Sequence, residues 1–184
     1  SGATARIGDS SLNVGTVTKS LYQEHPDVAS LTATDVASRR AAVRASLENC
    51  DMNPVFRFDQ CGFGDDLLQC CVGFQAPSAI QATCWPIVLS GRDLVGVAAT
   101  GSGKTLAFGL PALTHIQANR NLQKGAGGKT KLPQCLIMSP TRELAMQIAE
   151  VLVEAGKPAG LRTVCCYGGV PKRDQQQEIR QVKF

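Results

Sequence analysis

The sequence is poor in aromatic side chains and in histidine, which limits the kinds of site it can build. Aromatic residues make up 5% of the chain, with one Trp, and there are only two His residues. A zinc site would therefore need several cysteines, yet none of the eight cysteines belongs to a C-x-x-C pair. We expect reduced thiols that pack as small hydrophobic side chains, as in the cytosol or nucleus.

Long apolar runs are also missing. No run approaches the roughly 20 residues that a membrane-spanning helix needs. The N-terminus lacks the basic and then apolar arrangement of a secretion signal, and it begins with Ser1 and Gly2 rather than Met. We therefore expect a soluble intracellular protein without membrane contact, whose first residues come from a cleaved tag or from the inside of a longer protein.

The composition is that of a globular domain with an uneven charge distribution. The 184 residues are 43% hydrophobic and 18% charged, and the net charge is 19 − 15 = +4. Residues 1–119 carry 8 basic and 10 acidic side chains (−2), whereas residues 120–184 carry 11 and 5 (+6). The basic C-terminal part would attract a phosphate backbone, although a merely solvated basic face would have the same composition.

The stretch that carries the chemistry is residues 93–105, D-L-V-G-V-A-A-T-G-S-G-K-T. Its pattern predicts a buried strand, a glycine turn and a helix, in the order that a phosphate-binding loop requires. Lys104 would contact the β- and γ-phosphates of a nucleotide, and the Thr105 hydroxyl would bind Mg²⁺. Ala98 stands where the usual pattern has its first Gly. The loop residues expected to line the nucleotide are Ala98, Ala99, Thr100, Gly101, Ser102 and Gly103.

A second G-K-T triplet, at 128–130, provides a comparison within the same chain. No apolar strand precedes it, and Pro133 follows where a helix would have to continue. We interpret residues 125–130 as a solvated loop.

The order of elements predicts an α/β fold with a doubly wound parallel sheet. The apolar runs 94–99, 134–139 and 163–167 predict buried strands. Helices are expected over 37–47, 65–72, 78–89, 106–117 and 140–155, with a further helix from 171. Ligands of such a sheet bind at the carboxyl ends of the strands, where the phosphate loop lies.

Four motifs in this order resemble those of DEAD-box RNA helicases. They are G-F-Q-A-P-S-A-I-Q at 73–81, A-A-T-G-S-G-K-T at 98–105, P-T-R-E-L-A at 140–145 and G-G at 168–169. The resemblance implies a RecA-like ATP-binding domain, of which residues 55–184 are the incomplete first part, and a partly disordered N-terminal extension over 1–54. The Y-Q-E-H-P segment resembles the extension of a nuclear subgroup, which implies a nuclear or nucleolar location and ribonucleoprotein assembly factors as partners.

The resemblance also implies the nucleotide contacts, with ATP and Mg²⁺ as cofactors. Gln81 would recognise adenine, since its amide offers both a donor and an acceptor. An upstream aromatic ring would stack on the base; we favour Phe58, although Phe56 lies at the usual spacing from the glutamine motif. Phe74 is the aromatic residue within that motif.

The remaining motifs imply binding to RNA. Pro140, Thr141 and Arg142 at a helix N-terminus, together with Gly168 and Gly169, would contact the RNA backbone without sequence preference.

The 184 residues contain no D-E-A-D tetrapeptide, serine-rich coupling motif or second RecA-like domain. We therefore expect these residues alone to bind adenine nucleotide weakly and not to hydrolyse ATP appreciably. The leading interpretation is an ATP-dependent RNA helicase. The alternatives are a non-catalytic RNA- or partner-binding module, and another P-loop NTPase such as a DNA helicase.

Overall fold

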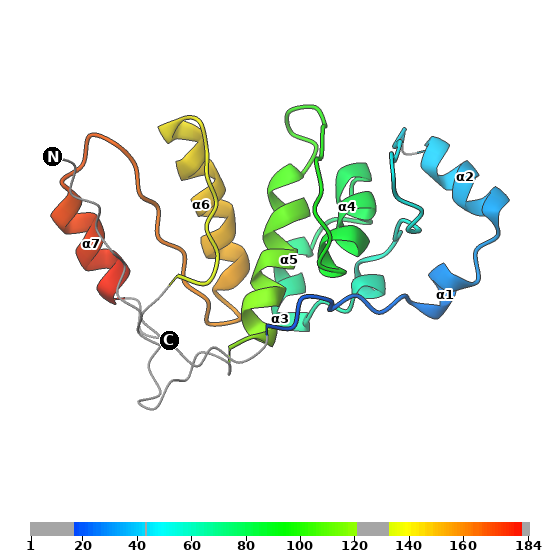
Figure 1. Ribbon diagram of the computed structural model, residues 1–184, viewed down its shortest axis with the longest axis horizontal. Helices are drawn as coiled ribbons and strands as arrows, with labels where there is room; N and C mark the ends of the chain where they lie inside the picture. The colour runs from blue at the N-terminus through cyan, green and yellow to red at the C-terminus, as the bar shows by residue number, and fades with distance from the viewer. Residues whose placement is uncertain (1–16, 43, 121–132, 182–184) are drawn as a thin grey trace, which may run out of the picture.

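The computed structural model describes residues 17–42, 44–120 and 133–181, and its regular elements are all helical (Figure 1). The helices are α1 (Pro26–Ala29), α2 (Ala33–Ala42), α3 (Asp65–Leu68), α4 (Ala79–Leu89), α5 (Lys104–Ala118), α6 (Arg142–Gly156) and α7 (Lys172–Gln181), with 3₁₀ turns over Phe58–Cys61 and Gln69–Cys71. Within the described ranges, no helix combines the length and apolar character that crossing a membrane would require.

The three strands predicted from the sequence do not form a sheet among these residues. Segments 94–99, 134–139 and 163–167 have no regular secondary structure and belong to no β-ladder. In the first two segments most apolar side chains are open to solvent, with Val97 90% exposed and Met138 86% exposed, whereas most of residues 163–167 are partly buried. A strand exists through hydrogen bonds to a neighbouring strand, and without that pairing the apolar pattern alone forms no strand.

Helices α4 and α5 form the centre of the molecule (Figure 1). Eight of the 11 residues of α4 are buried, as expected for a helix that is apolar on nearly every side. Trp85 is fully buried, and its indole Nε1 donates a hydrogen bond of 3.0 Å to the carbonyl oxygen of Leu106 in α5. The ring of Phe63 packs edge-on against Trp85 with centroids 5.0 Å apart. The hydrogen bond thus fixes α4 against α5, and the aromatic packing fixes α4 against the segment before α3 that carries Phe63.

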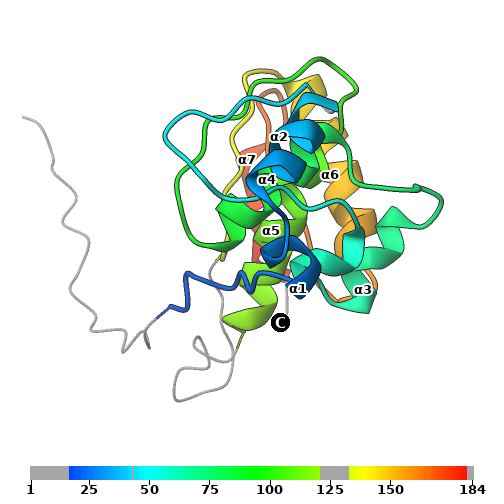
Figure 2. The same cartoon turned by 90° about the vertical axis from the view of Figure 1, so that its right-hand side faces the viewer.

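The N-terminal strap, residues 18–28, holds this pair of helices from outside. The side chain of Asn119 accepts from the amide of Thr18 at 2.9 Å and donates to the Thr18 carbonyl oxygen at 3.2 Å. Further along, the amide of Leu21 donates to the carbonyl oxygen of Leu89 at the end of α4. Val28 then lies fully buried in the main core. Figure 2 shows this segment, in blue, passing across α5 to reach α1.

Helix α6 packs beside α5 through one face only. It begins after Thr141, whose hydroxyl accepts from the amide of Leu144 at 3.3 Å, and its buried residues are Leu152, Ala155 and Gly156. Leu152 lies directly against Gly109 of α5, where an added Cβ atom would come within 2.5 Å of the leucine Cδ2. The absence of a side chain at this glycine therefore sets how closely the two helices approach.

Candidate nucleotide and RNA sites

The predicted adenine-binding glutamine lies directly against the phosphate loop. The Oε1 atom of Gln81 accepts from the amide of Ser78 at 3.0 Å, and its Nε2 donates to the carbonyl oxygen of Gly103 at 3.1 Å. Gly103 has φ +88°, and a Cβ atom there would lie 2.6 Å from Gln81 Nε2. Only glycine accommodates both this backbone conformation and this close approach. The start of α4 and the start of α5 therefore share one polar contact.

The phosphate loop is folded upon itself. The ammonium group of Lys104 donates to the carbonyl oxygens of Ala98 and Ala99 at 2.7 and 2.6 Å. The amide of Ser102 donates to the carbonyl oxygen of Ala99 at 3.3 Å, which closes the turn. In this arrangement the Lys104 cation is satisfied by backbone oxygens, and phosphate oxygens are the natural acceptors to replace them.

The groups around this loop fit a polyphosphate. Helix α5 is 15 residues long and begins at Lys104, so its free amides and its dipole favour an anion at this end. The Ser102 hydroxyl is buried and has no hydrogen-bond partner among the described residues, which leaves one polar group available. Thr105 occupies the first turn of α5, where a hydroxyl could bind a cation that accompanies the phosphates.

The three candidate aromatic rings have different surroundings. Phe58 is half-buried, and its ring centroid lies 6.0 Å from that of Trp85. The ring of Phe56 is covered instead by the guanidinium of Arg39 from α2, 4.4 Å from the ring centre. Phe74 is 66% exposed. Sequence reasoning did not anticipate that α2 reaches the Phe56 ring, since no motif links the two segments.

The residues predicted to contact RNA converge at the start of α6. Thr141 caps the helix and Arg142 opens it, next to the exposed Pro140. The Arg142 guanidinium lies over the ring of Tyr167, 4.4 Å from its centre. Gly168 and Gly169 follow Tyr167 directly, and Gly169 has φ +85°. The arginine of one motif and the glycines of the other are thus connected through a single aromatic side chain.

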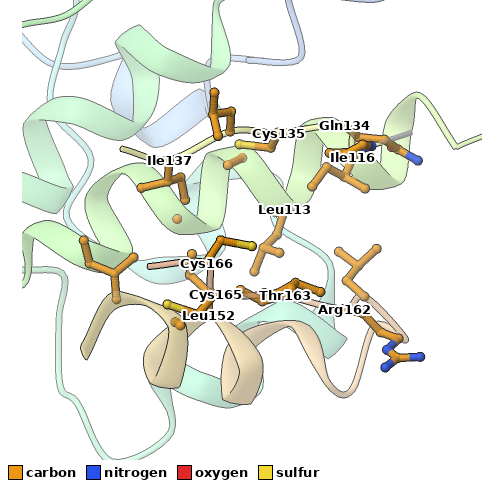
Figure 3. Close-up of a pocket in the computed structure, with 18 of the residues that line it drawn as sticks. Leu113, Ile116, Gln134, Cys135, Ile137, Leu152, Arg162, Thr163, Cys165 and Cys166 are labelled. Carbon is orange, nitrogen blue, oxygen red and sulfur yellow. The ribbon is translucent and has the colours of Figure 1, made fainter. Parts of the chain in front are cut away.

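A cavity of about 300 Å³ lies apart from the predicted nucleotide-binding residues. Figure 3 shows it between the segment that carries Cys135 and Ile137 and the segment that carries Thr163 and Cys165. Its remaining lining comes mostly from α5, α6 and α7 and is mainly apolar, and none of the predicted nucleotide-binding residues lines it. We regard it as space between unpaired sheet segments rather than as a phosphate site.

The second G-K-T triplet, at 128–130, falls outside the described residues, so its interpretation as a solvated loop stays a prediction.

Comparisons with known proteins identify the family. The sequence model of the DEAD/DEAH box helicases matches residues 78–184. The chain is 51% identical over 123 residues to "DEAD-box ATP-dependent RNA helicase 5" of Arabidopsis thaliana, covering 67% of this chain and 23% of that protein. It is 44% identical over 164 residues to "ATP-dependent RNA helicase dbp2" of Aspergillus oryzae, covering 88% of this chain and 29% of that protein. The chain therefore spans less than a third of the length of these relatives.

Solved structures of RNA helicases are also similar to this chain. The RNA helicase Prp28 from Chaetomium thermophilum bound to ADP matches with a TM-score of 0.70 and 31% identity, over 86% of this chain and 38% of that chain. The yeast DEAD-box splicing factor Prp28 matches with a TM-score of 0.66 and 26% identity, over 82% and 37%. These likenesses confirm the predicted RecA-like fold class, although the described residues form no strands. This chain belongs to the DEAD/DEAH box helicase family.

Proposed function

We propose that this chain forms the first part of the ATP-binding domain of an ATP-dependent RNA helicase. Gln81 recognises adenine, Lys104 and the phosphate-loop amides hold the phosphates, and Thr105 binds Mg²⁺. The Phe58 ring is the stacking partner of the base, since the Phe56 ring is already covered by Arg39. ATP binding in the whole protein serves to clamp RNA and separate its strands locally.

One observation carries this proposal: Gln81 donates to the carbonyl oxygen of Gly103, the residue that precedes Lys104. This contact joins the adenine-reading side chain to the phosphate loop, so both can contact one nucleotide. Gln81 is only 7% exposed and its amide is paired at both ends. Since the amide nitrogen has two N–H groups and the amide oxygen has two lone pairs, Gln81 can bond to adenine while it keeps these two contacts, which couples base recognition to the shape of the loop.

RNA binding is proposed for the start of α6. Thr141, Arg142, Gly168 and Gly169 offer a helix N-terminus, a guanidinium and an open backbone. These groups suit phosphates rather than base edges and predict binding without sequence preference. The basic C-terminal part of the chain favours the same partner. We also propose a nuclear or nucleolar location and ribonucleoprotein assembly factors as partners, on the strength of the Y-Q-E-H-P segment.

The nucleotide site can be tested with the two G-K-T triplets of this chain. Lys104→Ala removes the cation of the phosphate loop, whereas Lys129→Ala removes the corresponding charge from the other triplet. We expect Lys104→Ala to weaken the binding of a fluorescent ATP analogue at least about tenfold, because a charge-assisted contact is worth roughly 1.5–3 kcal/mol. Lys129→Ala should leave binding unchanged. Equal effects of the two substitutions would contradict the proposed site.

A further inference from the structure

We infer that Tyr167 and Gln175 are positioning residues for RNA binding: they hold Arg142 and the Gly168–Gly169 turn in one fixed arrangement. The inference rests on the proposed function, because it concerns how the proposed RNA site is built. Neither residue belongs to a motif singled out in the sequence, and neither is itself proposed to contact RNA.

Tyr167 fixes the direction of the arginine. Arg142 is exposed at the first position of α6, where a long side chain would otherwise sample many rotamers. The Tyr167 ring lies beneath its guanidinium, 4.4 Å from centroid to Cζ. A guanidinium stacked on a ring keeps its N–H donors at the edge free for an anion. The stacked arginine therefore stays able to bind a phosphate while losing less entropy when it does so.

Gln175 fixes the segment that carries both Tyr167 and the glycines. Its Oε1 accepts from the amide of Tyr167 at 2.9 Å, and its Nε2 donates to the Tyr167 carbonyl oxygen at 3.0 Å. The same Nε2 also donates to the carbonyl oxygen of Val170 at 3.2 Å. One amide side chain of α7 thus pairs with the backbone on both sides of the two glycines.

The hydrogen bonds of Gln175 matter because few other contacts restrain the turn at Gly168 and Gly169. Gly168 and Gly169 are exposed, Gly169 is in the left-handed region, and a Cβ atom on either glycine would meet nothing within 4 Å. Glycines in an open turn have the largest backbone freedom of any residue. The three hydrogen bonds of Gln175 restrict that freedom. The turn amides and the Arg142 guanidinium can then contact the same RNA strand.

The test measures binding of a fluorescein-labelled oligouridylate and of an ATP analogue to the 184-residue chain and its variants. Tyr167→Leu should weaken oligouridylate binding roughly two- to fivefold, the range expected for an exposed cation–π contact, and Tyr167→Phe should keep the wild-type affinity. Tyr167→Leu should also make the slope of log affinity against log salt shallower by up to about 0.7, the value of one single-strand phosphate contact. Binding of the ATP analogue should not change.

Gln175→Ala should weaken oligouridylate binding and speed hydrogen exchange at the Tyr167 amide, each by roughly two- to tenfold, as for the loss of one backbone hydrogen bond. Gln176→Ala, an exposed neighbour on the same helix, is the matched control and should change neither.

Wild-type binding with no effect of Tyr167→Leu or Gln175→Ala would overturn the inference and leave the proposed function standing. Failure of the wild-type chain to bind oligouridylate would instead overturn the RNA part of the proposed function, and the inference with it. Equal weakening of RNA and ATP binding by these variants would show a general structural role and would also overturn the inference.

Discussion

Two parts of this molecule are built differently, although each carries one of the proposed binding sites. We call the described residues up to 120 the nucleotide half and residues 133–181 the RNA half. In the nucleotide half, eight of the 11 residues of α4 are buried, and side chains such as Trp85 bond to backbone more than 20 positions away. In the RNA half, only three of the 15 residues of α6 are buried, and none of residues 172–180 in α7. The nucleotide half is a packed core, whereas the RNA half joins that core through a few residues such as Leu152, Ala155 and Leu161, and its proposed site is held by polar and ring contacts.

This difference explains how each site is positioned. Gln81 and the phosphate loop are fixed because the helices that carry them are packed together, and a hydrogen bond from Gln81 to the carbonyl oxygen of Gly103 joins them directly. Arg142 and the glycine turn lack such a core beneath them, so a ring and an amide side chain take its place. The first site should therefore be sensitive to core substitutions and the second to single surface substitutions.

The largest expected effect comes from the core of the nucleotide half. Trp85→Ala should lower the free energy of unfolding by about 3–5 kcal/mol, because it leaves a cavity beside Phe63 and removes the indole hydrogen bond to the Leu106 carbonyl oxygen. Met138→Ala truncates an 86%-exposed side chain in the other half and should cost less than about 0.5 kcal/mol. Urea unfolding measures both changes. Similar costs would mean that stability is spread evenly over the chain and would contradict the difference between the two halves.

A smaller effect is expected from the N-terminal strap. Asn119→Ala removes both hydrogen bonds to Thr18 and should lower the free energy of unfolding by about 1–3 kcal/mol. The reason is that Asn119 is 7% exposed and the backbone groups of Thr18 lose their hydrogen-bond partner. Asn53, whose amide makes one exposed contact of 3.4 Å to Glu24, provides the control, and Asn53→Ala should be close to neutral. Thermal unfolding of the two variants distinguishes a structural strap from a loosely attached extension, for which both substitutions would be neutral.

The last effect appears only at alkaline pH and is absent near neutral pH. Burial raises the pKa of the Cys61 thiol to about 12 from its ordinary value of 9.0. Burial and the nearby Glu24 carboxylate raise the pKa of Tyr22 to about 12 from 10.0. Both folded-state pKa values are raised, so this stability is fully present below pH 9 and is lost as the pH rises from 9 towards 12. Cys61→Ala should flatten the decline, which urea titrations at about pH 8 to 11 would show. A decline of the same steepness in Cys61→Ala would contradict this assignment.

The sequence predicted the helices near the nucleotide site well because their signals are local. Helix α4 matches the expected range 78–89 to within one residue, and α5 begins at Lys104, directly after the glycine turn and two residues before the expected start. The position of Gln81 against the loop also agrees with the motif order, since the two helices that carry them pack together. Whether these side chains bind the nucleotide as proposed stays a prediction that the experiments must test.

Other features could not be read from the sequence because they depend on distant pairing. The apolar pattern at 94–99 predicted a buried strand, but a strand requires a paired neighbour that no local pattern specifies, and the described residues supply none. Tyr167 is one aromatic residue and Gln175 is one polar residue, and neither belongs to a periodic pattern or to a sequence motif. Their roles follow from three hydrogen bonds and one ring contact that only the structure brings together.

The most direct test of the central claim is base selectivity at the nucleotide site. A fluorescent ATP analogue bound to the wild-type chain should be displaced by unlabelled ATP at far lower concentration than by GTP, because the amide of Gln81 matches the edge of adenine and not that of guanine. In Gln81→Ala, ATP and GTP should compete almost equally. The control is Gln75→Ala, at an exposed glutamine nearby, and it should preserve the preference for ATP over GTP. A chain that prefers ATP equally with and without Gln81 would contradict the account.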